Sequence, residues 1–356
     1  MPLTALSPVR ISGLTVCTGP LKRTLEDEAA LFQDAPEQLD KVRNFVGIET
    51  RYLAPTGITT LDLAEQAVQR LLAGDAGSEA PPDALIFVTQ TPDYFQPCNA
   101  NILHGRLGLP SHTAAFDVNQ GCSGWVYGFW LAASLIAAGS AQRVLLLAGD
   151  TVTQKIHPRD RATRPLFSDA CSATLVERGT EKDIWSFEMA SDGKGYESIC
   201  IPGGAHRGLN KNGQDQEETD ADGNVRTPSH LFMNGLEVFN FTLREEPKAV
   251  RQFMETANLK PEDVDALVFH QANRFILQNL AKRLGFSMGK VPHRTLRDFG
   301  NQSSASIPAA LCHDLGEVLA TDTQRILCSG FGVGLSWATC YGKMGPLKNL
   351  SIFPFS

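Results

Sequence analysis

Short apolar runs alternate with longer amphipathic segments along much of the chain. Residues 85–88 are apolar at every position, which is typical of a strand that is covered on both faces. Residues 61–72, which precede this run, carry apolar side chains at helical spacing and predict an amphipathic helix. Strands that alternate with helices in this way predict an α/β fold with mainly parallel sheets.

The pattern occurs twice, weakly but in the same order. Asp83-Ala-Leu-Ile-Phe-Val88 recurs 182 positions later as Asp265-Ala-Leu-Val-Phe-His270, and Asn119-Gln120 recurs at the same offset as Asn301-Gln302. A further pair at this offset is Arg143-Val-Leu-Leu-Leu147 and Arg325-Ile-Leu-Cys328. The repeat predicts two pseudo-symmetric βαβ halves that pack against each other.

We divide the chain into residues 1–180 and residues 236–356, with a polar excursion at 181–235 between the two halves. The excursion is rich in glycine and includes Gly203-Gly204 and Asp220-Ala-Asp-Gly223. We expect it either to carry a loop that faces substrate or a dimer partner, or to be a simple surface insertion.

Composition narrows the class of protein. The 356 residues suffice for a large core, and a net charge of −7 with a pI near 5.6 argues against nucleic acid as the main partner. No apolar stretch reaches membrane-spanning length, and the N-terminus lacks a signal pattern, so we expect a cytoplasmic protein with no membrane segment. The eight cysteines are scattered, which favours reduced thiols over a disulfide framework, and no Cys/His set has the spacing of a zinc site.

One cysteine stands at a predicted strand-to-helix turn. Cys122 lies in Phe116-Asp-Val-Asn-Gln-Gly-Cys-Ser-Gly-Trp125, and a long apolar helical run follows at 125–136. The free N–H groups and the dipole at the start of that helix are expected to lower the pKa of the thiol and favour the thiolate. The alternative is that Cys122 is a small buried hydrophobic residue.

The repeat indicates which residues accompany this thiol. His270 ends the second copy of a strand whose first copy ends in Val88, and Asn301 lies at the second turn of the same copy. At the position of Cys122 the second copy has Ser304. These differences fall at the carboxyl ends of strands, where open α/β sheets bind their ligands. We therefore predict that Cys122, His270 and Asn301 form one site.

A cysteine, a histidine and an asparagine in this order suit attack of a thiolate on a carbonyl carbon. Papain-type peptidases use such a set, and Asn119-Gln-Gly-Cys-Ser-Gly-Trp125 superficially resembles their active-site segment. The local order of residues differs from that family, and an internal duplication has no place in its fold.

Four segments together resemble another family, the β-ketoacyl-acyl-carrier-protein synthase III enzymes. They are Asp117-Val-Asn-Gln-Gly-Cys-Ser-Gly124, His270-Gln-Ala-Asn273, Gly300-Asn-Gln-Ser-Ser-Ala-Ser306 and Gly330-Phe-Gly-Val-Gly-Leu-Ser-Trp337. The resemblance covers nearly the whole chain. It implies a thiolase-like fold, in which the two halves form a layered αβαβα sandwich, and a homodimer.

The resemblance also implies a reaction. Cys122 would take an acyl group from an acyl thioester, and a malonyl thioester would then condense with it, losing CO₂, to give a β-ketoacyl product. His270 Nε2–H and the Asn301 amide would stabilise the negative charge that develops on the thioester oxygen. An asparagine at 301 favours decarboxylative condensation, because a carboxylate there would instead act as a base on an alcohol or amine.

Three alternatives stay open. A same-fold acyltransferase would move the acyl group to an alcohol or amine without releasing CO₂. A papain-like hydrolase would cleave peptides. A silent subunit of a heterodimer would not need Cys122.

The remaining site positions follow from the resemblance as well. Backbone N–H groups of Cys122 and Val333 would form the oxyanion hole for acyl transfer. No cofactor or metal is expected; acyl-CoA or acyl-carrier-protein thioesters would be the substrates. The glycine-rich loop at 330–334 lacks the spacing of a dinucleotide fingerprint. The implied substrate-binding or carrier-binding residues are Arg161, Asn273, Arg274, Phe331, Gly332 and Gly334.

A basic stretch suggests a carrier protein as partner. Between Gln271 and Arg297 there is no acidic residue, and an acidic acyl carrier protein would complement this stretch, unless it is simply a solvated helix face. Its cations are Arg274, Lys282, Arg283, Lys290, Arg294 and Arg297.

The chain also departs from the family. Lys41 stands where the family has a tryptophan that stacks on the adenine of coenzyme A, and Phe45 stands where it has a basic residue. This favours a carrier-bound donor or a non-acetyl primer. Residues 166–172 carry larger side chains than the glycine-rich family segment, which would reshape the acyl pocket.

Overall fold

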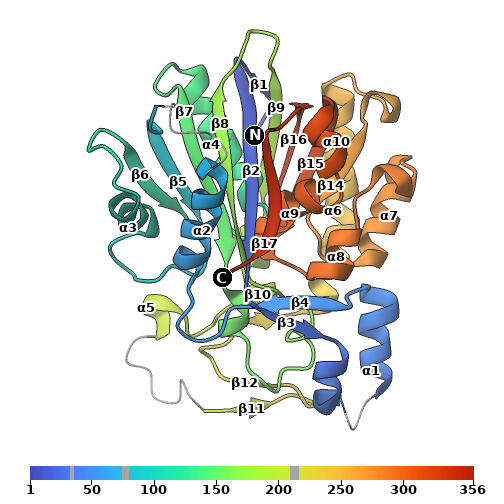
Figure 1. Ribbon diagram of the computed structural model, residues 1–356. Coiled ribbons are helices and arrows are strands. Elements are labelled where there is room, and N and C mark those ends of the chain that lie inside the picture. The colour runs from blue at the N-terminus through green and yellow to red at the C-terminus, as the bar shows by residue number, and fades with distance from the viewer. Residues whose placement is uncertain (33–35, 74–79, 209–215) are drawn as a thin grey trace.

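Two β-sheets form the frame of the molecule (Figure 1). The structure is a computed structural model that describes residues 1–32, 36–73, 80–208 and 216–356. The six-stranded sheet has the order β17 (Asn349–Pro354), β2 (Val9–Thr18), β8 (Ala170–Arg178), β7 (Arg143–Asp150), β5 (Ala84–Val88) and β6 (Ala114–Val118). The five-stranded sheet has the order β1 (Thr4–Leu6), β9 (Trp185–Ser191), β16 (Ser336–Met344), β15 (Gln324–Gly332) and β14 (Ala266–Phe269).

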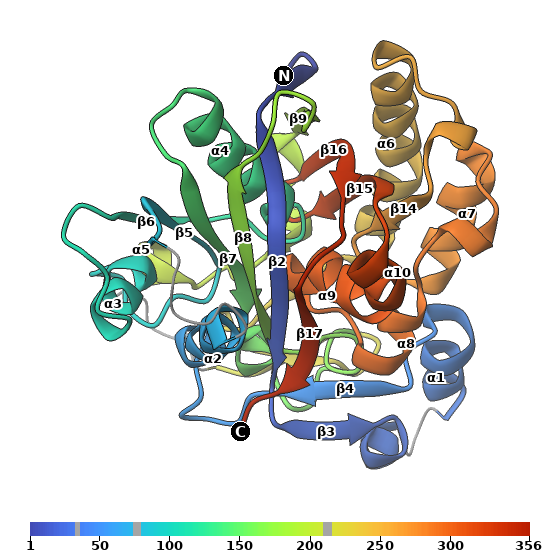
Figure 2. The same ribbon diagram turned by 45° about the horizontal axis from the view of Figure 1, so that its top comes forward.

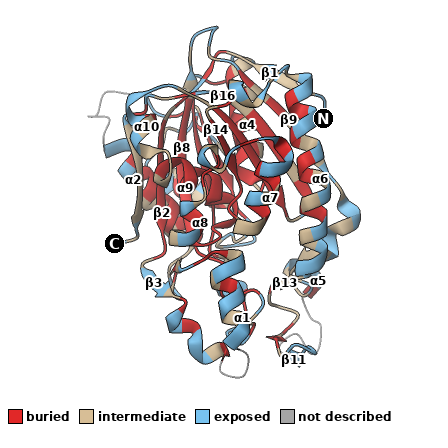
Figure 3. Cartoon of the chain, turned by 90° about the vertical axis from the view of Figure 1, so that its right-hand side faces the viewer, coloured by how far each residue is buried: buried red, intermediate tan, exposed pale blue. Residues whose placement is uncertain are grey.

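Helices cover both outer faces of the sheets and fill the space between them. The central layer consists of α4 (Gly124–Ala137) and α9 (Ser306–His313), and their buried side chains join one apolar cluster with strands of both sheets. α2 (Thr60–Ala73) and α3 (Asn99–Arg106) cover the six-stranded sheet, while α6 (Gly235–Thr256) and α7 (Arg274–Leu284) cover the five-stranded one. Figure 3 shows the buried strands and inner helices at the centre of the molecule. The αβαβα sandwich implied by the sequence is thus confirmed.

Strand β5 shows why its sequence is apolar throughout. Leu85 and Phe87 face the cluster that includes α2, whereas Ile86 and Val88 face the cluster that includes α4. Alternate side chains of a strand point to opposite faces, so a strand between two helical layers needs apolar residues at every position.

The two halves repeat each other in detail. β5 pairs in parallel with β7, and β14 pairs in parallel with β15. Asp83 Oδ2 accepts a hydrogen bond from the backbone N–H of Arg143 (3.1 Å), and Asp265 Oδ2 accepts the equivalent bond from Arg325 (2.8 Å). The predicted duplication is therefore visible in the topology and in its hydrogen bonds.

The sheets do not coincide with the division of the chain that we drew from the sequence. β9 lies at the start of the 181–235 segment, yet it pairs with β16 in the five-stranded sheet. β1 also adds to that sheet, whereas the C-terminal strand β17 pairs with β2 in the six-stranded sheet. Each half thus receives an edge strand from the opposite end of the chain, because a strand joins whichever edge offers free backbone groups. The polar excursion begins only after Ser191.

Smaller elements gather at one end of the sandwich, at the bottom of Figure 1, and Figure 2 shows β3 and β4 running along this end. They are β3 (Leu21–Thr24), β4 (Thr50–Leu53), α1 (Pro36–Lys41), α5 (Ala205–Gly208), β11 (Glu218–Thr219) and β12 (Val225–Arg226). No helix in the described ranges is long and apolar enough to cross a membrane.

A buried ion pair fixes this end of the molecule. Arg51 on β4 is 1% exposed, and its guanidinium lies 2.6 Å from a carboxylate oxygen of Glu28. It also donates to the backbone carbonyls of Arg164 (2.7 Å) and Phe167 (3.2 Å). Arg51 thereby ties β4 to the segment that carries Phe167.

Replacing Arg51 with methionine is expected to lower the free energy of unfolding by about 3 kcal/mol, because it leaves a buried carboxylate with one cation fewer. Arg164, 2.9 Å from Glu28, still contacts that carboxylate and keeps the loss at the lower end of the usual range. Urea unfolding measures it. Arg10→Met is the matched control, since the Arg10–Glu177 pair (3.2 Å) has a 56% exposed arginine and contributes about 1 kcal/mol or less. Equal losses in both variants would contradict the expectation.

Candidate active site

A cavity of about 370 Å³ opens where the strands of both halves end. Cys122, His270 and Asn301 all line it, so the structure brings the three predicted residues into one site. Its polar wall also includes Gln90 and Thr91 after β5, Asn119 after β6, and Asp150 at the end of β7. Its apolar wall includes Val152, Leu166, Phe167, Ile199, Ile201, Leu231 and Met233.

Cys122 lies in the turn between β6 and α4. The backbone N–H groups of Val333 and of Cys122 itself hydrogen-bond its sulfur. A Cβ at Gly332 would lie only 2.8 Å from that sulfur, so the loop after β15 closes over the thiol because residue 332 is a glycine.

The expectation of a lowered pKa at Cys122 was wrong. The pKa of this thiol is raised to about 11, because burial and, to a lesser extent, the negative charge of Asp150 outweigh the opposing effect of the two N–H groups. The first turn of α4 does favour the thiolate, but removing a charged sulfur from water costs more. Cys122 is therefore a neutral thiol at physiological pH.

His270 follows β14 and is almost fully buried. Its backbone N–H donates to the carbonyl of Ser329 (2.9 Å), and its ring stands edge-on to Phe331 at a centroid distance of 5.7 Å. Burial lowers the pKa of His270 to about 3. The imidazole is thus neutral at physiological pH and can donate one N–H to an oxygen without carrying a positive charge.

Asn301 lies in the turn between α8 (Arg294–Phe299) and α9. Its backbone bridges to Phe167, since the Asn301 N–H donates to Leu166 (3.0 Å) and the Asn301 carbonyl accepts from Ser168 (2.8 Å). The side-chain Oδ1 accepts the N–H of Ser303 (2.9 Å). With its oxygen engaged in this way, the amide leaves its N–H groups for the cavity.

Two serines that sequence reasoning missed orient the loop after β15. Ser123 Oγ and Ser336 Oγ lie 2.8 Å apart, and Ser336 Oγ donates to the carbonyl of Val333 (2.8 Å). Both serines are buried. This chain of hydrogen bonds fixes the peptide next to the N–H that faces Cys122. Phe331, Gly332 and Val333 line the cavity, whereas Gly334, which the resemblance also implied, is not among the lining residues.

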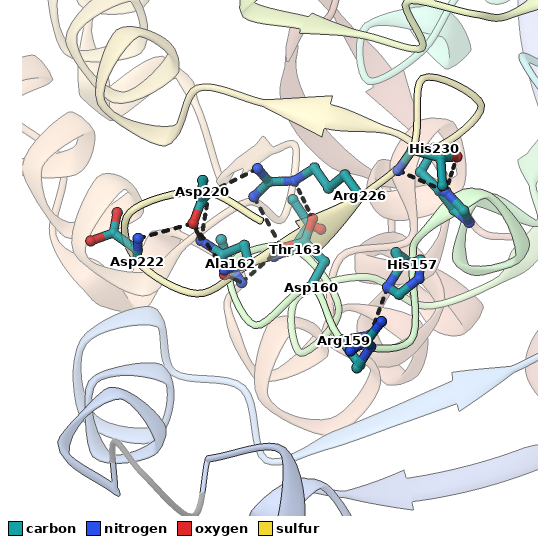
Figure 4. A network of polar contacts seen from close by, with 11 residues as sticks. His157, Arg159, Asp160, Ala162, Thr163, Asp220, Asp222, Arg226 and His230 are labelled. Atoms are coloured by element: carbon teal, nitrogen blue, oxygen red, sulfur yellow. Dashed lines mark hydrogen bonds and ion pairs between the residues drawn. The ribbon is translucent and has the colours of Figure 1, made fainter. Parts of the chain in front are cut away.

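Arg161 lies outside the cavity wall. Its guanidinium donates to the backbone carbonyl of Asp222 (2.6 Å). Figure 4 shows the surrounding network, in which Arg226 pairs with the buried Asp160 (2.6 Å) and with Asp220 (3.0 Å). Here the polar excursion is anchored to the segment after β7, and Arg161 is engaged by the chain itself.

Asn273 lines the cavity and begins α7. Its Oδ1 accepts hydrogen bonds from the backbone N–H groups of Phe275 (2.8 Å) and Ile276 (3.3 Å), so it is a helix cap. Arg274 points away from the cavity wall, and its guanidinium donates to the backbone carbonyl of Asn44. Gly47 packs against the side chain of Arg274.

A stack of aromatic rings runs from the surface to the cavity. Phe45 is 44% exposed and stacks on Phe275 at a centroid distance of 4.5 Å, and Phe275 stacks on Phe239 at 5.8 Å. Phe239 lines the cavity. The departure from the family at position 45 therefore gives the cavity an apolar approach.

The basic stretch is not one uniform cationic surface. Arg294 pairs with Asp314 (3.1 Å), which the fold brings in from the end of α9, and Arg297 pairs with Asp298 (2.7 Å), the residue directly after the stretch. The Lys290 ammonium caps the carbonyls of Pro261 (2.8 Å) and Val264 (2.6 Å). Besides Lys290, the cations of the stretch that contact no carboxylate among the described residues are those of α7, Arg274, Lys282 and Arg283.

Asp150 and Ser303 also line the cavity, and sequence reasoning missed both. The internal repeat could have identified Asp150. Asp150 ends β7 and lies 182 positions before Gly332, which was singled out in the second copy.

Comparisons with known proteins agree with this geometry. Residues 116–193 match the family model for 3-oxoacyl-[acyl-carrier-protein] synthase III, and residues 254–344 match the model for its C-terminal part. A putative 3-oxoacyl-[acyl-carrier-protein] synthase 3 of Campylobacter jejuni is 33% identical over 98% of both chains. A beta-ketoacyl-[acyl-carrier-protein] synthase III of Clostridium perfringens is 33% identical over 91% of this chain and 96% of its own. The crystal structure of a 3-oxoacyl-(acyl-carrier protein) synthase from Burkholderia xenovorans superposes with a TM-score of 0.91 at 34% identity, covering 99% of this chain and 98% of the other.

Proposed function

The chain belongs to the 3-oxoacyl-[acyl-carrier-protein] synthase III family, and on this premise we propose that Cys122, His270 and Asn301 condense an acyl thioester with a malonyl thioester. The enzyme is an acyltransferase that forms a β-ketoacyl product with loss of CO₂. One observation carries the assignment of residues. A thiol, a neutral imidazole and a fixed amide meet in one cavity.

In the first half-reaction the Cys122 sulfur attacks the carbonyl carbon of the acyl thioester, and the donor leaves as a thiol. Negative charge develops on the carbonyl oxygen. The N–H groups of Cys122 and Val333 face the sulfur, so they are placed to donate to this oxyanion. The apolar wall around Phe167, Leu231 and Met233 accepts the acyl chain.

In the second half-reaction the malonyl group loses CO₂. The electron pair of the broken C–C bond forms an enolate, whose carbon attacks the acyl-Cys122 carbonyl and releases the cysteine. His270 and Asn301 stabilise the enolate oxygen as neutral donors. Asn301 gives no base for an alcohol or amine acceptor, and this supports condensation over simple acyl transfer.

Intact-protein mass tests the assignment. Brief exposure to a panel of acyl-CoA and acyl-carrier-protein thioesters is expected to add one acyl group, and malonyl-carrier protein is expected to discharge it with release of CO₂. Cys122→Ser should form no stable adduct. An adduct that malonyl donors leave untouched would support an acyltransferase without decarboxylation. No adduct from any thioester would overturn the proposal.

We place the docking site for an acyl carrier protein at α7 and the neighbouring Phe45. Arg274, Lys282 and Arg283 lie on α7, which begins at the cavity, and carrier proteins are acidic. The exposed ring of Phe45 adds an apolar contact beside them. Because Arg161 is engaged by a backbone carbonyl of the chain itself, a carrier-bound donor fits this surface better than coenzyme A.

Lys282→Glu is expected to raise KM for malonyl-carrier protein by about three- to ten-fold and to leave KM for malonyl-CoA unchanged, because only the carrier protein contacts α7. Steady-state kinetics with both donors measures this. Lys182→Glu, in the exposed turn between β8 and β9, is the control with the same change of charge. If Lys282→Glu raised KM equally for both donors, the result would show that the carrier protein docks elsewhere on the surface.

We also propose a homodimer in the cytoplasm. β6 is an edge strand of the six-stranded sheet, and Phe116 and Val118 on it are only half-buried. A second copy could pair with this edge and cover those side chains. All eight cysteines are free, which supports a reducing compartment.

A further inference from the structure

A carboxylate is buried in the wall of the cavity. Asp150 is 1% exposed and is the last residue of β7. Its Oδ1 accepts the backbone N–H of Gln90 (2.7 Å) and the hydroxyl of Thr89 (3.2 Å), and its Oδ2 accepts the hydroxyl of Ser304 (2.9 Å). Such a group needs a reason to lie in a largely apolar cavity, because burying a carboxylate is costly.

The Ser303 hydroxyl connects this carboxylate to the nucleophile. It lines the same cavity as these two groups and lowers the pKa of both the Cys122 thiol and the Asp150 carboxyl. Ser303 has a backbone φ of 50°, in the left-handed region that serine seldom adopts, and the Asn301 side chain holds its N–H there. A strained residue that is held in place by its neighbours is often part of a functional site.

The repeat shows that this arrangement is specific to the first half. Cys122 corresponds to Ser304, and Asp150 corresponds to Gly332. Gly332 lies against Cys122, and Asp150 lies against Ser304. At the point where the second half has a glycine that leaves room for the Cys122 side chain, the first half thus has a carboxylate.

Cys122 needs a proton acceptor, since it rests as a thiol. Two groups near it in the cavity wall could act as a base, His270 and Asp150. The pKa of His270 is lowered to about 3 by burial, so it is a weak base. Burial raises the pKa of Asp150 above its usual range, which makes it a better proton acceptor. The titratable groups that face Asp150 are Cys122 from the turn before α4, Asp169 and Cys171 from the start of β8, and His270 across the cavity.

We propose that Asp150 accepts the Cys122 proton through the Ser303 hydroxyl during acylation. The inference rests on the proposed function and names the base of its first half-reaction. As the sulfur bonds to the acyl carbon, the S–H proton passes to Ser303 Oγ, and the Ser303 proton passes to an Asp150 oxygen. When the carbon–sulfur bond to the donor breaks, its electron pair stays on the leaving sulfur. The proton then returns through Ser303 to this sulfur. The donor leaves as a thiol, and Asp150 ends as a carboxylate.

The experiment compares the two half-reactions in Asp150→Asn and in two neighbouring serine variants. Single-turnover mass spectrometry is expected to show acylation about a hundredfold slower in Asp150→Asn and slowed in Ser303→Ala. Ser304→Ala, which removes a hydrogen bond to the same carboxylate outside the relay, should acylate within about threefold of the wild type. Decarboxylation of the malonyl donor, which uses His270 and Asn301, should change little in all three.

Two further readouts separate a relay from a structural role. Removing the charge of Asp150 lowers the pKa of Cys122, so iodoacetamide at pH 8 should alkylate Asp150→Asn faster than the wild type, although acylation is slower. The wild-type acylation rate should fall as acid protonates Asp150, and this acid limb should vanish in Asp150→Asn. Folding defects cannot produce effects of opposite sign.

Three results would overturn the relay. They are acylation of Asp150→Asn at the wild-type rate, equal losses in Ser303→Ala and Ser304→Ala, and parallel losses of acylation, alkylation and decarboxylation with a lower melting temperature. If the wild type itself forms no adduct, the proposed function fails first. If the wild type forms the adduct and Asp150→Asn matches it, only the relay fails.

Discussion

His270→Ala is expected to slow decarboxylation of the malonyl thioester by about 10²–10³-fold, the usual loss when one oxyanion donor is removed. Formation of the acyl-Cys122 adduct should continue, because the N–H groups of Cys122 and Val333, rather than His270, face the sulfur. Release of labelled CO₂ and the mass of the adduct measure the two steps separately.

The pH profile adds a check on the same residue. The pKa of His270 is lowered from 6.5 to about 3, so the ring stays neutral above about pH 4 and the decarboxylation rate should show no limb near pH 6.5. Asn301→Ala should lose decarboxylation to a similar extent, while His313→Ala, a histidine outside the cavity wall, serves as control. A limb near pH 6.5, or loss of adduct in His270→Ala, would assign His270 to acylation instead.

Gly332→Ala is expected to reduce acylation and alkylation of Cys122 by at least about a hundredfold. The added Cβ would lie 2.8 Å from both Cβ and Sγ of Cys122, closer than real contacts permit, and the φ of 154° disfavours a side chain as well. The loop that carries the Val333 N–H must therefore move away from the thiol.

Gly235→Ala provides the matched control for this change. Gly235 also lines the cavity, but nothing lies within 4 Å of the Cβ that would be added there. Iodoacetamide labelling and single-turnover acylation compare the two variants, with the melting temperature recorded alongside. Unchanged labelling of Gly332→Ala would show that the loop can retreat without consequence.

The sequence was sufficient for the fold, and it indicated three residues that the structure brings together in one cavity. The repeat of the strands at 83–88 and 265–270 predicted two similar halves, and the positions where the copies differ, Cys122 and His270, marked the cavity. These predictions succeeded because strand ends and apolar periodicity are local properties that a sequence displays directly.

Properties that depend on the surroundings were not predictable in this way. The direction of the pKa shift at Cys122 depends on burial and on Asp150, which lies 28 positions further along the chain. Arg294 looked uncompensated in a stretch without acids, yet the fold supplies Asp314, which lies 20 positions further along the chain. Pairing of this kind becomes visible only when segments distant in sequence are placed side by side.

The exchange of edge strands has a consequence for synthesis of the protein on the ribosome. β2 is made among the first residues, but its neighbour β17 spans Asn349–Pro354. The edge of the six-stranded sheet therefore stays open until almost the whole chain has been translated, although its other strands are complete by Arg178. A nascent chain with an unpaired edge strand is prone to aggregate. We therefore expect the risk of aggregation through this edge to last until β17 has been made and has paired with β2.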